Sequence, residues 1–403
     1  MKYFLFVLVS VVLVSCAKES KQLEPGHWRA VLELNDEKEL PFLLEYEEDS
    51  TFIITNAEER IEVDDVTFNG DSIIISHPIF EGVIKGTFTK DKIKGSFLKP
   101  SLDREVPIVM TSGRQARFKV SAAPNTIVAG TWETVFSPNN QNERYVAKGV
   151  FEQKGNMVTG TFLTTTGDYR YLEGVIENDS LKLSTFDGAH AFLFEAKVTE
   201  NDSVLNGLFY SGNHWKESFT AKRNEKYELP KADSLTFLKK GYDSLAFSFP
   251  NVKGDTISLK DEKFQNKVVI VQLMGTWCPN CLDETKYFSN YYKNKPENVE
   301  FVSLAFEYAP SKEKAVQAIS KLQKAVGVPY PILLAQYGSS SKQQANEKLP
   351  MLNHVLSYPT TIFIDKTGTV RKIHTGFSGP ATGEKYEEFK KEFEGFTEML
   401  ANE

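Results

Sequence analysis

The feature that most constrains this chain is a pair of cysteines, Cys278 and Cys281, that are separated by two residues and follow an apolar run. That run, residues 268–274, is typical of a buried strand, and the residues from Leu282 onward can continue as a helix. A helix N-terminus stabilises negative charge and offers N–H groups to a thiolate. We therefore expect Cys278 to act as a nucleophile and Cys281 to attack the resulting mixed disulfide.

A third cysteine, Cys16, ends a short apolar stretch near the N-terminus. The stretch, residues 3–14, is too short to span a bilayer with ease, and the tetrapeptide Leu-Val-Ser-Cys that ends at Cys16 matches the bacterial lipobox. We expect residues 1–15 to be a lipoprotein signal peptide, Cys16 to be lipidated and residues 16–25 to form a tether. The alternative is an ordinary signal peptide whose cleavage region contains a cysteine.

Cysteine count and charge narrow the kinds of site and partner. With Cys16 acylated, only Cys278 and Cys281 remain, so a structural disulfide within one chain is not expected. Two cysteines without two further nearby ligands also leave a tetrahedral zinc site unfilled, and we expect no cofactor beyond the redox-active pair. The net charge is −7 and positive charge forms no stripe, which argues against nucleic acid as a partner. The mature protein is expected to be a soluble body tethered by lipid outside the cytoplasm.

The part of the chain before the cysteine pair is rich in short alternating segments separated by turn residues, which predicts an all-β region. It also shows an internal duplication with an offset of about one hundred residues. The matching stretches are Gly26-His27-Trp28 with Gly130-Thr131-Trp132, Asp71-Ser72-Ile73 with Asp179-Ser180-Leu181, and residues 93–97 with 205–209. We expect β module 1 over residues 26–120 and β module 2 over residues 126–223, as barrels or sandwiches. Two halves of one barrel, or chance similarity, are the alternatives.

The all-β region carries no recognisable chemistry. Its histidines are scattered without the spacing of metal ligands, and they are His27, His77, His190 and His214. Its tryptophans are expected in the core rather than on a sugar-binding surface, and they are Trp28, Trp132 and Trp215. A binding role for this region stays open.

A change of composition over residues 224–246 indicates a linker, and α/β signals follow it. Strands are expected over residues 268–274, 299–306, 332–335, 360–365 and 370–374, and helices over 282–295, 311–326, 341–348 and 386–400. This order of strand, helix, strand, then helix, hairpin and helix predicts a thioredoxin fold for residues 247–403.

Three motifs in the C-terminal part carry a family resemblance. They are Trp277-Cys278-Pro279-Asn280-Cys281, Glu284, and Tyr358-Pro359-Thr360-Thr361 before residues 362–365 and Gly368. With them, residues 247–403 resemble the TlpA-type thioredoxin-like thiol:disulfide oxidoreductases of the AhpC/TSA-related superfamily, which are membrane-tethered proteins of the bacterial envelope.

The resemblance implies a role for each motif residue. Cys278 would be the nucleophile, Cys281 the resolving thiol, and Pro359 a cis-proline that faces the dithiol. The backbone beside Pro359 would pair with an extended substrate strand. The substrate-binding residues would be Trp277, Pro279, Asn280, Tyr358, Pro359 and Thr360.

One departure from thioredoxin concerns proton transfer. Thioredoxin carries a buried Asp on the strand before the motif, where this chain has Gln272, which cannot transfer a proton. TlpA-type proteins often carry a carboxylate at the position of Glu284, which could take the proton from Cys281. The alternative is a solvated glutamate beside Asp283 on the helix surface.

Two further stretches lie where α/β proteins collect their sites. Glu307 directly follows the expected strand 299–306 and should lie at its carboxyl edge. Residues 374–383 are rich in small residues and either shape a substrate groove or form an ordinary connection.

The residues and the resemblance together predict a membrane-anchored thiol:disulfide oxidoreductase that reduces protein disulfides. Its partners would be disulfide-containing envelope proteins, an upstream membrane thiol that donates electrons, and the membrane itself through Cys16. One alternative is a surface or periplasmic binding lipoprotein whose β region is the main functional module. A thiol peroxidase is less favoured, because that chemistry needs a lone peroxidatic cysteine in a Thr/Pro pocket with a nearby arginine. The direction of electron flow in the cell stays open.

Overall fold

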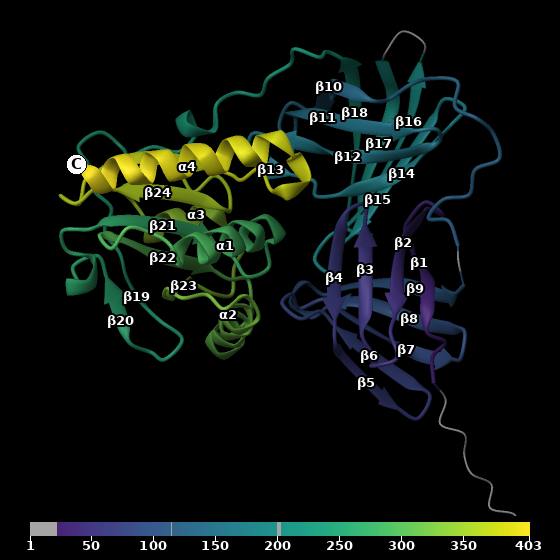
Figure 1. Ribbon diagram of the computed structural model, residues 1–403, viewed down its shortest axis with the longest axis horizontal. Helices are drawn as coiled ribbons and strands as arrows, with labels where there is room; N and C mark the ends of the chain where they lie inside the picture. The colour runs from purple at the N-terminus through teal and green to yellow at the C-terminus, as the bar shows by residue number, and fades with distance from the viewer. Residues whose placement is uncertain (1–21, 114, 200–202) are drawn as a thin grey trace, which may run out of the picture.

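The computed structural model describes residues 22–113, 115–199 and 203–403 of the chain. The expected signal peptide over residues 1–15 and the lipidation site Cys16 lie outside these residues. Within them, no helix has both the length and the apolar character needed to cross a membrane. The described chain forms two large β-sheets followed by an α/β domain (Figure 1).

The first β-sheet is antiparallel and lies within β module 1. Its strands are β1 (Gly26–Glu33), β2 (Glu39–Tyr46), β3 (Phe52–Asn56), β4 (Glu59–Val63), β5 (Asp65–Asn69), β6 (Ser72–Ser76), β7 (Val83–Thr89), β8 (Lys92–Lys99) and β9 (Arg104–Ser112), with a 3-10 turn η1 at Pro100–Leu102. They pair in the order β4-β3-β2-β1-β9-β8-β7-β6-β5. Along β1, Trp28, Ala30 and Leu32 are buried and alternate with more exposed neighbours, as the two-residue period of a half-buried strand requires.

The second β-sheet has nine strands and closes on itself. They are β10 (Gly130–Phe136), β11 (Tyr145–Lys154), β12 (Met157–Thr164), β13 (Gly167–Asp168), β14 (Leu172–Glu177), β15 (Ser180–Phe186), β16 (Ala191–Thr199), β17 (Ser203–Ser211) and β18 (Trp215–Arg223). The sheet is a barrel because β11 pairs with both β10 and β12. Phenylalanines fill its interior: the rings of Phe136 and Phe162 meet edge to face at 5.4 Å, and those of Phe194 and Phe209 stack at 4.6 Å.

The two sheets are repeats of one unit, as the sequence predicted. In each unit the first strand pairs with the last, β1 with β9 and β10 with β18. Trp28 Nε1 donates to the Glu24 carbonyl at 2.8 Å, and Trp132 Nε1 donates to the Val128 carbonyl at the same distance, four residues upstream in both cases. Trp215 breaks the expectation of a core tryptophan: it is 40% exposed at the start of β18, where its Nε1 donates to a Glu217 oxygen at 3.1 Å.

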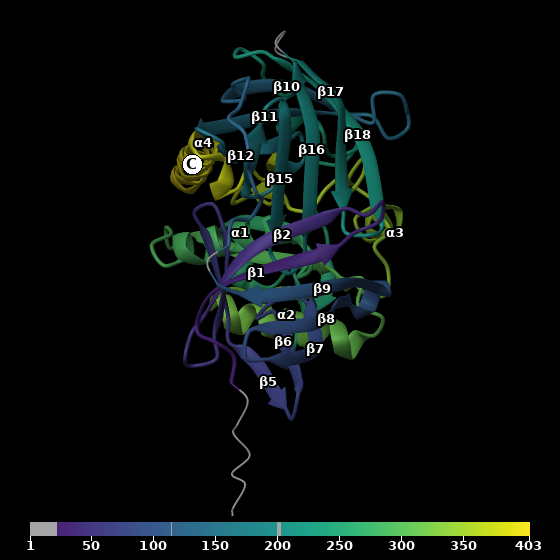
Figure 2. The same ribbon diagram turned by 90° about the vertical axis from the view of Figure 1, so that its right-hand side faces the viewer.

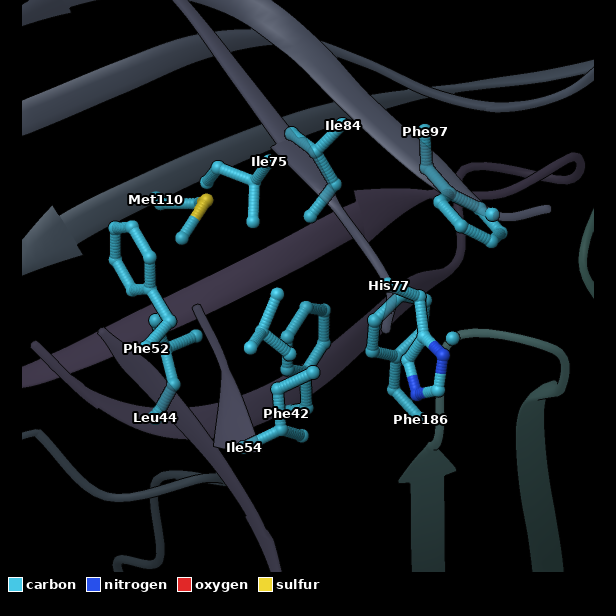
Figure 3. Close-up of a pocket in the computed structure, with 13 residues that line it drawn as sticks. Phe42, Leu44, Phe52, Ile54, Ile75, His77, Ile84, Phe97, Met110 and Phe186 are labelled. Carbon is cyan, nitrogen blue, oxygen red and sulfur yellow. The ribbon is translucent and has the colours of Figure 1, made fainter. Parts of the chain in front are cut away.

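The two β-sheets lie next to each other (Figure 2), and buried side chains join them. Arg117, in the connection between them, donates to the Thr55 carbonyl at 2.6 Å and pairs with Glu173 at 3.3 Å. Phe186 of β15 stacks on Phe42 of β2, with ring centroids 4.2 Å apart. Between the rings of the first sheet lies an apolar cavity of about 30 Å³, and His77 and Phe186 line one end of it (Figure 3).

The segment expected as a linker packs on the α/β domain over its second half. After the 3-10 turn η2 (Ala232–Ser234), Lys239 N donates to the Met351 carbonyl at 2.8 Å, and Leu245 is buried in the core of that domain. The buried side chain of Leu245 therefore anchors the end of the linker in the α/β domain.

The α/β domain has the thioredoxin order of elements. The central sheet runs β23-β22-β21-β24-β25, with β21 (Val268–Met274) parallel to β22 (Val299–Phe306) and antiparallel to β24 (Thr360–Ile364). The remaining elements are β19 (Ser248–Pro250), β20 (Thr256–Ser258), η3 (Glu262–Phe264), β23 (Ile332–Gln336), β25 (Val370–Thr375), η4 (Pro380–Thr382) and the helices α1 (Pro279–Tyr292), α2 (Lys312–Val326), α3 (Lys342–Lys348) and α4 (Glu384–Asn402). All seven residues of β21 are buried, which explains its uninterrupted apolar run.

Candidate active site

The cysteine pair lies where strand β21 gives way to helix α1. Cys278 is the N-cap residue of α1, and Cys281 N–H donates to Cys278 Sγ at 3.2 Å. The two cysteines form a disulfide with Cα atoms 5.2 Å apart. Cys281 is completely buried, whereas Cys278 keeps 7% of its surface. A backbone N–H at a helix N-terminus is therefore directed at the sulfur that lies nearer to solvent, which favours a thiolate on Cys278.

The loop before β24 brings a proline to the same place. The Tyr358–Pro359 bond is cis, and the Tyr358 carbonyl oxygen lies 3.6 Å from Cys278 Sγ. The Tyr358 ring meets the Trp277 ring edge to face at 5.8 Å, and Trp277 Nε1 donates to the Phe306 carbonyl at 3.0 Å. Thr360 is buried directly after the cis bond. The structure thus gathers the expected tryptophan, tyrosine and proline around the sulfur of Cys278.

Glu284 points into the protein, which rules out the solvated helix face as its environment. Its Oε1 accepts from Thr361 Oγ1 at 2.8 Å, and its Oε2 accepts from Gln272 Nε2 at 2.9 Å. Complete burial raises the pKa of this carboxyl to about 8, against the opposing effect of the two hydrogen bonds. Gln272 Nε2 also lies 3.4 Å from the Cys281 carbonyl oxygen, so one amide links the acid to the buried cysteine. A carboxyl that holds its proton near neutral pH can exchange that proton with a thiol.

Glu307 follows β22 at the carboxyl edge of the sheet, where the sequence placed it. It accepts from Thr276 N at 2.8 Å and from Thr276 Oγ1 at 2.7 Å, and burial raises the pKa of its carboxyl to about 7. Because Thr276 directly precedes Trp277, Glu307 fixes the approach to the cysteine motif. Gly376, in the small-residue stretch after β25, donates its N–H to the Pro359 carbonyl at 2.8 Å and so supports the cis-proline loop.

The all-β region contributes residues to the site that the sequence did not reveal. Asn280, within the cysteine motif, donates through Nδ2 to the Asp168 carbonyl of β13 at 3.3 Å. Asp283 of α1 forms a buried ion pair with Arg170. The first contact joins residues 112 positions apart and the second residues 113 apart, and no local pattern in either stretch indicates such a pairing.

In the part of the chain that the structure describes, no group of three or more histidine, cysteine, aspartate or glutamate side chains could hold a metal ion. The four histidines of the β region have separate surroundings; His190, for example, lies beside Asp187 with 3.2 Å between Nδ1 and Oδ2.

Comparisons with known proteins match the domain that carries this site. A family model described as Redoxin matches residues 239–388. Thioredoxin-like protein YneN of Bacillus subtilis is 27% identical over 139 residues, which are 34% of this chain and 73% of that protein. Thiol-disulfide oxidoreductase ResA of Geobacillus kaustophilus is 30% identical over 131 residues, 32% of this chain and 66% of the relative. Thiol:disulfide interchange protein DsbE of Vibrio cholerae is 28% identical over 113 residues, 28% of this chain and 52% of the relative.

Among solved structures, a thiol-disulfide oxidoreductase from Bacteroides fragilis matches 37% of this chain and 99% of its own, with 22% identity and a TM-score of 0.27. The Redoxin match begins at residue 239 and leaves the all-β region outside it. The C-terminal domain is therefore a thioredoxin-like thiol:disulfide oxidoreductase domain of the TlpA type, and its redox centre is a cysteine pair.

Proposed function

We propose that this protein reduces disulfides of other proteins outside the cytoplasm, with Cys278 as nucleophile and Cys281 as resolving thiol. The observation that carries the proposal is the contrast between the two sulfurs: Cys278 caps helix α1 and keeps a little exposure, whereas Cys281 is completely buried. A partner disulfide can therefore meet only the first sulfur, and the second acts within the protein.

The reaction is two successive thiol–disulfide exchanges, starting from the dithiol form of the protein. The Cys278 thiolate attacks one sulfur of the substrate disulfide, the substrate S–S bond breaks, and one substrate thiolate leaves. Cys281 then gives up its proton and attacks Cys278 Sγ, which releases the second substrate thiolate. The substrate gains two electrons and two protons, and the protein is left with its 278–281 disulfide. An external dithiol reductant must restore the dithiol, which is the role of the expected membrane thiol donor.

Glu284 is the group suited to exchange the proton of Cys281. Its carboxyl is buried beside that cysteine's helix turn, and Gln272 connects the two through hydrogen bonds of 2.9 Å to the acid and 3.4 Å to the Cys281 carbonyl. General acid–base help of this kind is typically worth about 10²–10⁴ in rate.

Substrate would bind beside the cis-proline. We assign this role to residues of the cysteine motif and of the cis-proline loop, which are Trp277, Pro279, Asn280, Tyr358, Pro359 and Thr360. The Tyr358 carbonyl lies 3.6 Å from the sulfur and can pair with the backbone of an extended chain.

The location is proposed from Cys16, which lies outside the described residues. A lipid on this cysteine would tether the protein to the envelope, where disulfide-containing proteins are its substrates. Cys16→Ser should move the protein from the membrane fraction to the soluble fraction, and unchanged fractionation would exclude the anchor.

The division of labour between the thiols is tested by trapping. Cys281→Ser keeps the nucleophile and removes the resolver, so it should accumulate mixed disulfides with substrate proteins on non-reducing gels. Cys278→Ser should trap far less, because Cys281 is buried. Equal trapping by both variants, or trapping by neither, would contradict the proposed roles.

A further inference from the structure

Three segments of the all-β region pack on the part of the α/β domain that carries the dithiol. They are the β6–β7 loop (residues 77–82), the β15–β16 loop (residues 187–190), and residues 164–170, which include β13. Phe80 of the first loop and Ala189 of the second are buried in the same apolar cluster as Cys278, Cys281 and Leu282. The two loops occupy equivalent places in the two repeated units, so the duplication delivers a pair of matching loops to one site.

Residues 164–170 follow the surface on which a substrate strand would lie. Ser357 Oγ, next to the cis-proline loop, donates to the Thr166 carbonyl at 3.3 Å. A Cβ atom built on Gly376 would lie 2.5 Å from the Thr166 carbonyl carbon, so the two backbones are in direct contact. Gly379 N donates to Asp168 Oδ2 at 2.7 Å. The segment is thus bonded both to the cis-proline loop and to the small-residue stretch after β25.

The three segments, residues 77–82, 164–170 and 187–190, form a cover over the cysteine motif, and a buried ion cluster holds this cover in place. Arg170 pairs with Asp283 of α1, with Glu59 of β4 at 2.5 Å and with Asp187 at 3.6 Å. The side chains of all four residues are at most 12% exposed. Breaking one partner of such a cluster leaves an uncompensated buried charge, which is strongly unfavourable. The cluster therefore ties both β-sheets to the helix that carries the cysteines.

A cavity of about 310 Å³ remains beside the motif, between the β6–β7 loop and the α/β domain. Ile79 and Phe80 form one wall, and Trp277 with Tyr308 forms the other. Two hydrogen bonds set its width: Tyr308 Oη donates to Glu81 Oε1 at 3.1 Å, and Lys321 Nζ donates to the His77 carbonyl at 2.6 Å. Cys278 itself does not line this cavity and is only 7% exposed.

We propose that the β region is the specificity-determining wall of the active site, with Ile79, Phe80 and residues 164–170 as its contacting parts. It bars the surface of a folded protein from Cys278 and admits disulfides on unfolded or short extended chains, with preference for an apolar or aromatic residue next to the substrate cysteine. The inference rests on the proposed reductase function and adds the class of substrate. A flexible chain can enter beside Trp277 by displacing one loop, whereas a folded surface must displace the whole cover.

The test compares one disulfide in two settings, with the full chain carrying Cys16→Ser. A ten-residue segment closed by a disulfide, with Phe next to one cysteine, is offered as a free peptide and displayed in a surface loop of a stable folded protein. We expect kcat/KM for the free peptide to exceed that for the displayed form by roughly tenfold or more. Asp283→Ala removes the α1 partner of Arg170. This variant should raise kcat/KM for the displayed disulfide by roughly tenfold and so narrow the difference in kcat/KM between the free and displayed disulfides.

Two matched comparisons complete the design. Phe80→Ala should lose the preference for Phe over Ser beside the substrate cysteine. Arg60→Ala removes the exposed Arg60–Glu45 pair, which takes no part in the Arg170 cluster although Arg60 follows Glu59 on β4. This variant should retain both the selectivity for the free peptide and the preference for Phe. A readout without any active-site variant is alkylation of the reduced protein: Cys278 should react with iodoacetamide but far more slowly with a maleimide carrying a large polymer.

The outcomes separate the inference from the function beneath it. Two results would contradict the proposal that the β region blocks access to Cys278. One is equal kcat/KM of the wild-type sequence for the free and displayed disulfides. The other is equal alkylation of Cys278 by small and bulky reagents, relative to an unfolded control. Absence of turnover on both substrates, with no mixed disulfide in Cys281→Ser, would instead overturn the reductase function.

Discussion

At the scale of single residues, burial assigns different tasks to groups of the same kind. Cys278 and Cys281 differ in exposure, 7% against 0%, and that difference supports the proposed roles of nucleophile and resolver. The sequence predicted both roles because a cysteine pair at a helix start has a defined chemistry. It favoured a proton-transfer role for Glu284 but kept an alternative, because a glutamate next to Asp283 can also be a solvated helix residue. Only the packing of α1 on the sheet, with Thr361 and Gln272 as donors, decides that this acid is buried.

The buried acid gives a prediction about stability. The pKa of Glu284 is raised from the ordinary value of 4.5 to about 8, so the folded state favours the protonated acid. This contribution to stability is fully present below about pH 4.5 and is lost as pH rises through about 8. Glu284→Gln keeps the size of the side chain and cannot ionise. Between about pH 5 and about pH 9, the free energy of unfolding of the variant should therefore fall less than that of the wild-type protein, by on the order of 4 kcal/mol. Urea unfolding of the oxidised protein measures this difference.

A surface glutamate supplies the control for that experiment. Glu313 lies exposed in the first turn of α2, and Glu313→Gln should follow the wild-type pH dependence. If Glu284→Gln follows it too, the carboxyl of Glu284 ionises as readily in the folded protein as in the unfolded chain, and its role as a proton-holding group fails.

At the scale of elements, most helices and strands of the α/β domain were predictable, because their apolar periods and caps are local. Ser311, for example, caps α2 through a hydrogen bond from Lys314 N, as its position before the apolar pattern indicated. The start of α1 was placed at residue 282 but lies at Pro279. The missed signal is proline itself, which is favoured in the first turn of a helix because it lacks an N–H there.

The geometry of the β6–β7 loop depends on one histidine. His77 Nδ1 accepts from the backbone N–H groups of Ile79 and Phe80 at 3.1 and 3.0 Å, so this nitrogen must be unprotonated. Burial lowers the pKa of His77 from 6.5 to about 4. The charged groups that face it are Asp187, which opposes the shift, and Lys321 and Lys286, which add to it. A neutral histidine thus holds Phe80 over the dithiol.

Acid should therefore loosen this loop. The folded state disfavours protonation of His77, so this contribution is present above about pH 6.5 and is lost as pH falls through about 4. His77→Asn retains an acceptor oxygen without a titrating ring. Between about pH 6.5 and about pH 4, the free energy of unfolding of this variant should therefore fall by about 3 kcal/mol less than that of the wild-type protein. His27→Asn, at a half-exposed histidine outside this loop, is the matched control. Indistinguishable acid titrations of His77→Asn and His27→Asn would show that the loop does not depend on neutral His77.

At the scale of the whole molecule, the sequence predicted two β modules and a thioredoxin-like domain but not the contacts between them. The duplication was visible because both repeats keep a Gly-x-Trp start, and the thioredoxin order was visible in its motifs. The docking of the β region on the dithiol was not, because it depends on pairs such as Lys321 with the His77 carbonyl, 244 positions apart. A single sequence offers no signal for such pairs, because a lysine is usually exposed and a backbone carbonyl carries no sequence information.

The ion cluster of Arg170 predicts that these bodies unfold together. Arg170 connects Glu59 of the first sheet, Asp187 of the β15–β16 loop and Asp283 of the thioredoxin-like domain, and the four side chains are at most 12% exposed. Calorimetry of the full chain should give one cooperative transition. Arg170→Met leaves three acids without their cation, which should cost about 3–5 kcal/mol and separate the transition of the β region from that of the α/β domain. Arg60→Met, at an exposed pair worth about 0–1 kcal/mol, should keep the single transition. If Arg170→Met also unfolds in one step at an unchanged temperature, the cluster does not couple the domains, and the apolar contacts of Phe80 and Ala189 must hold the cover instead.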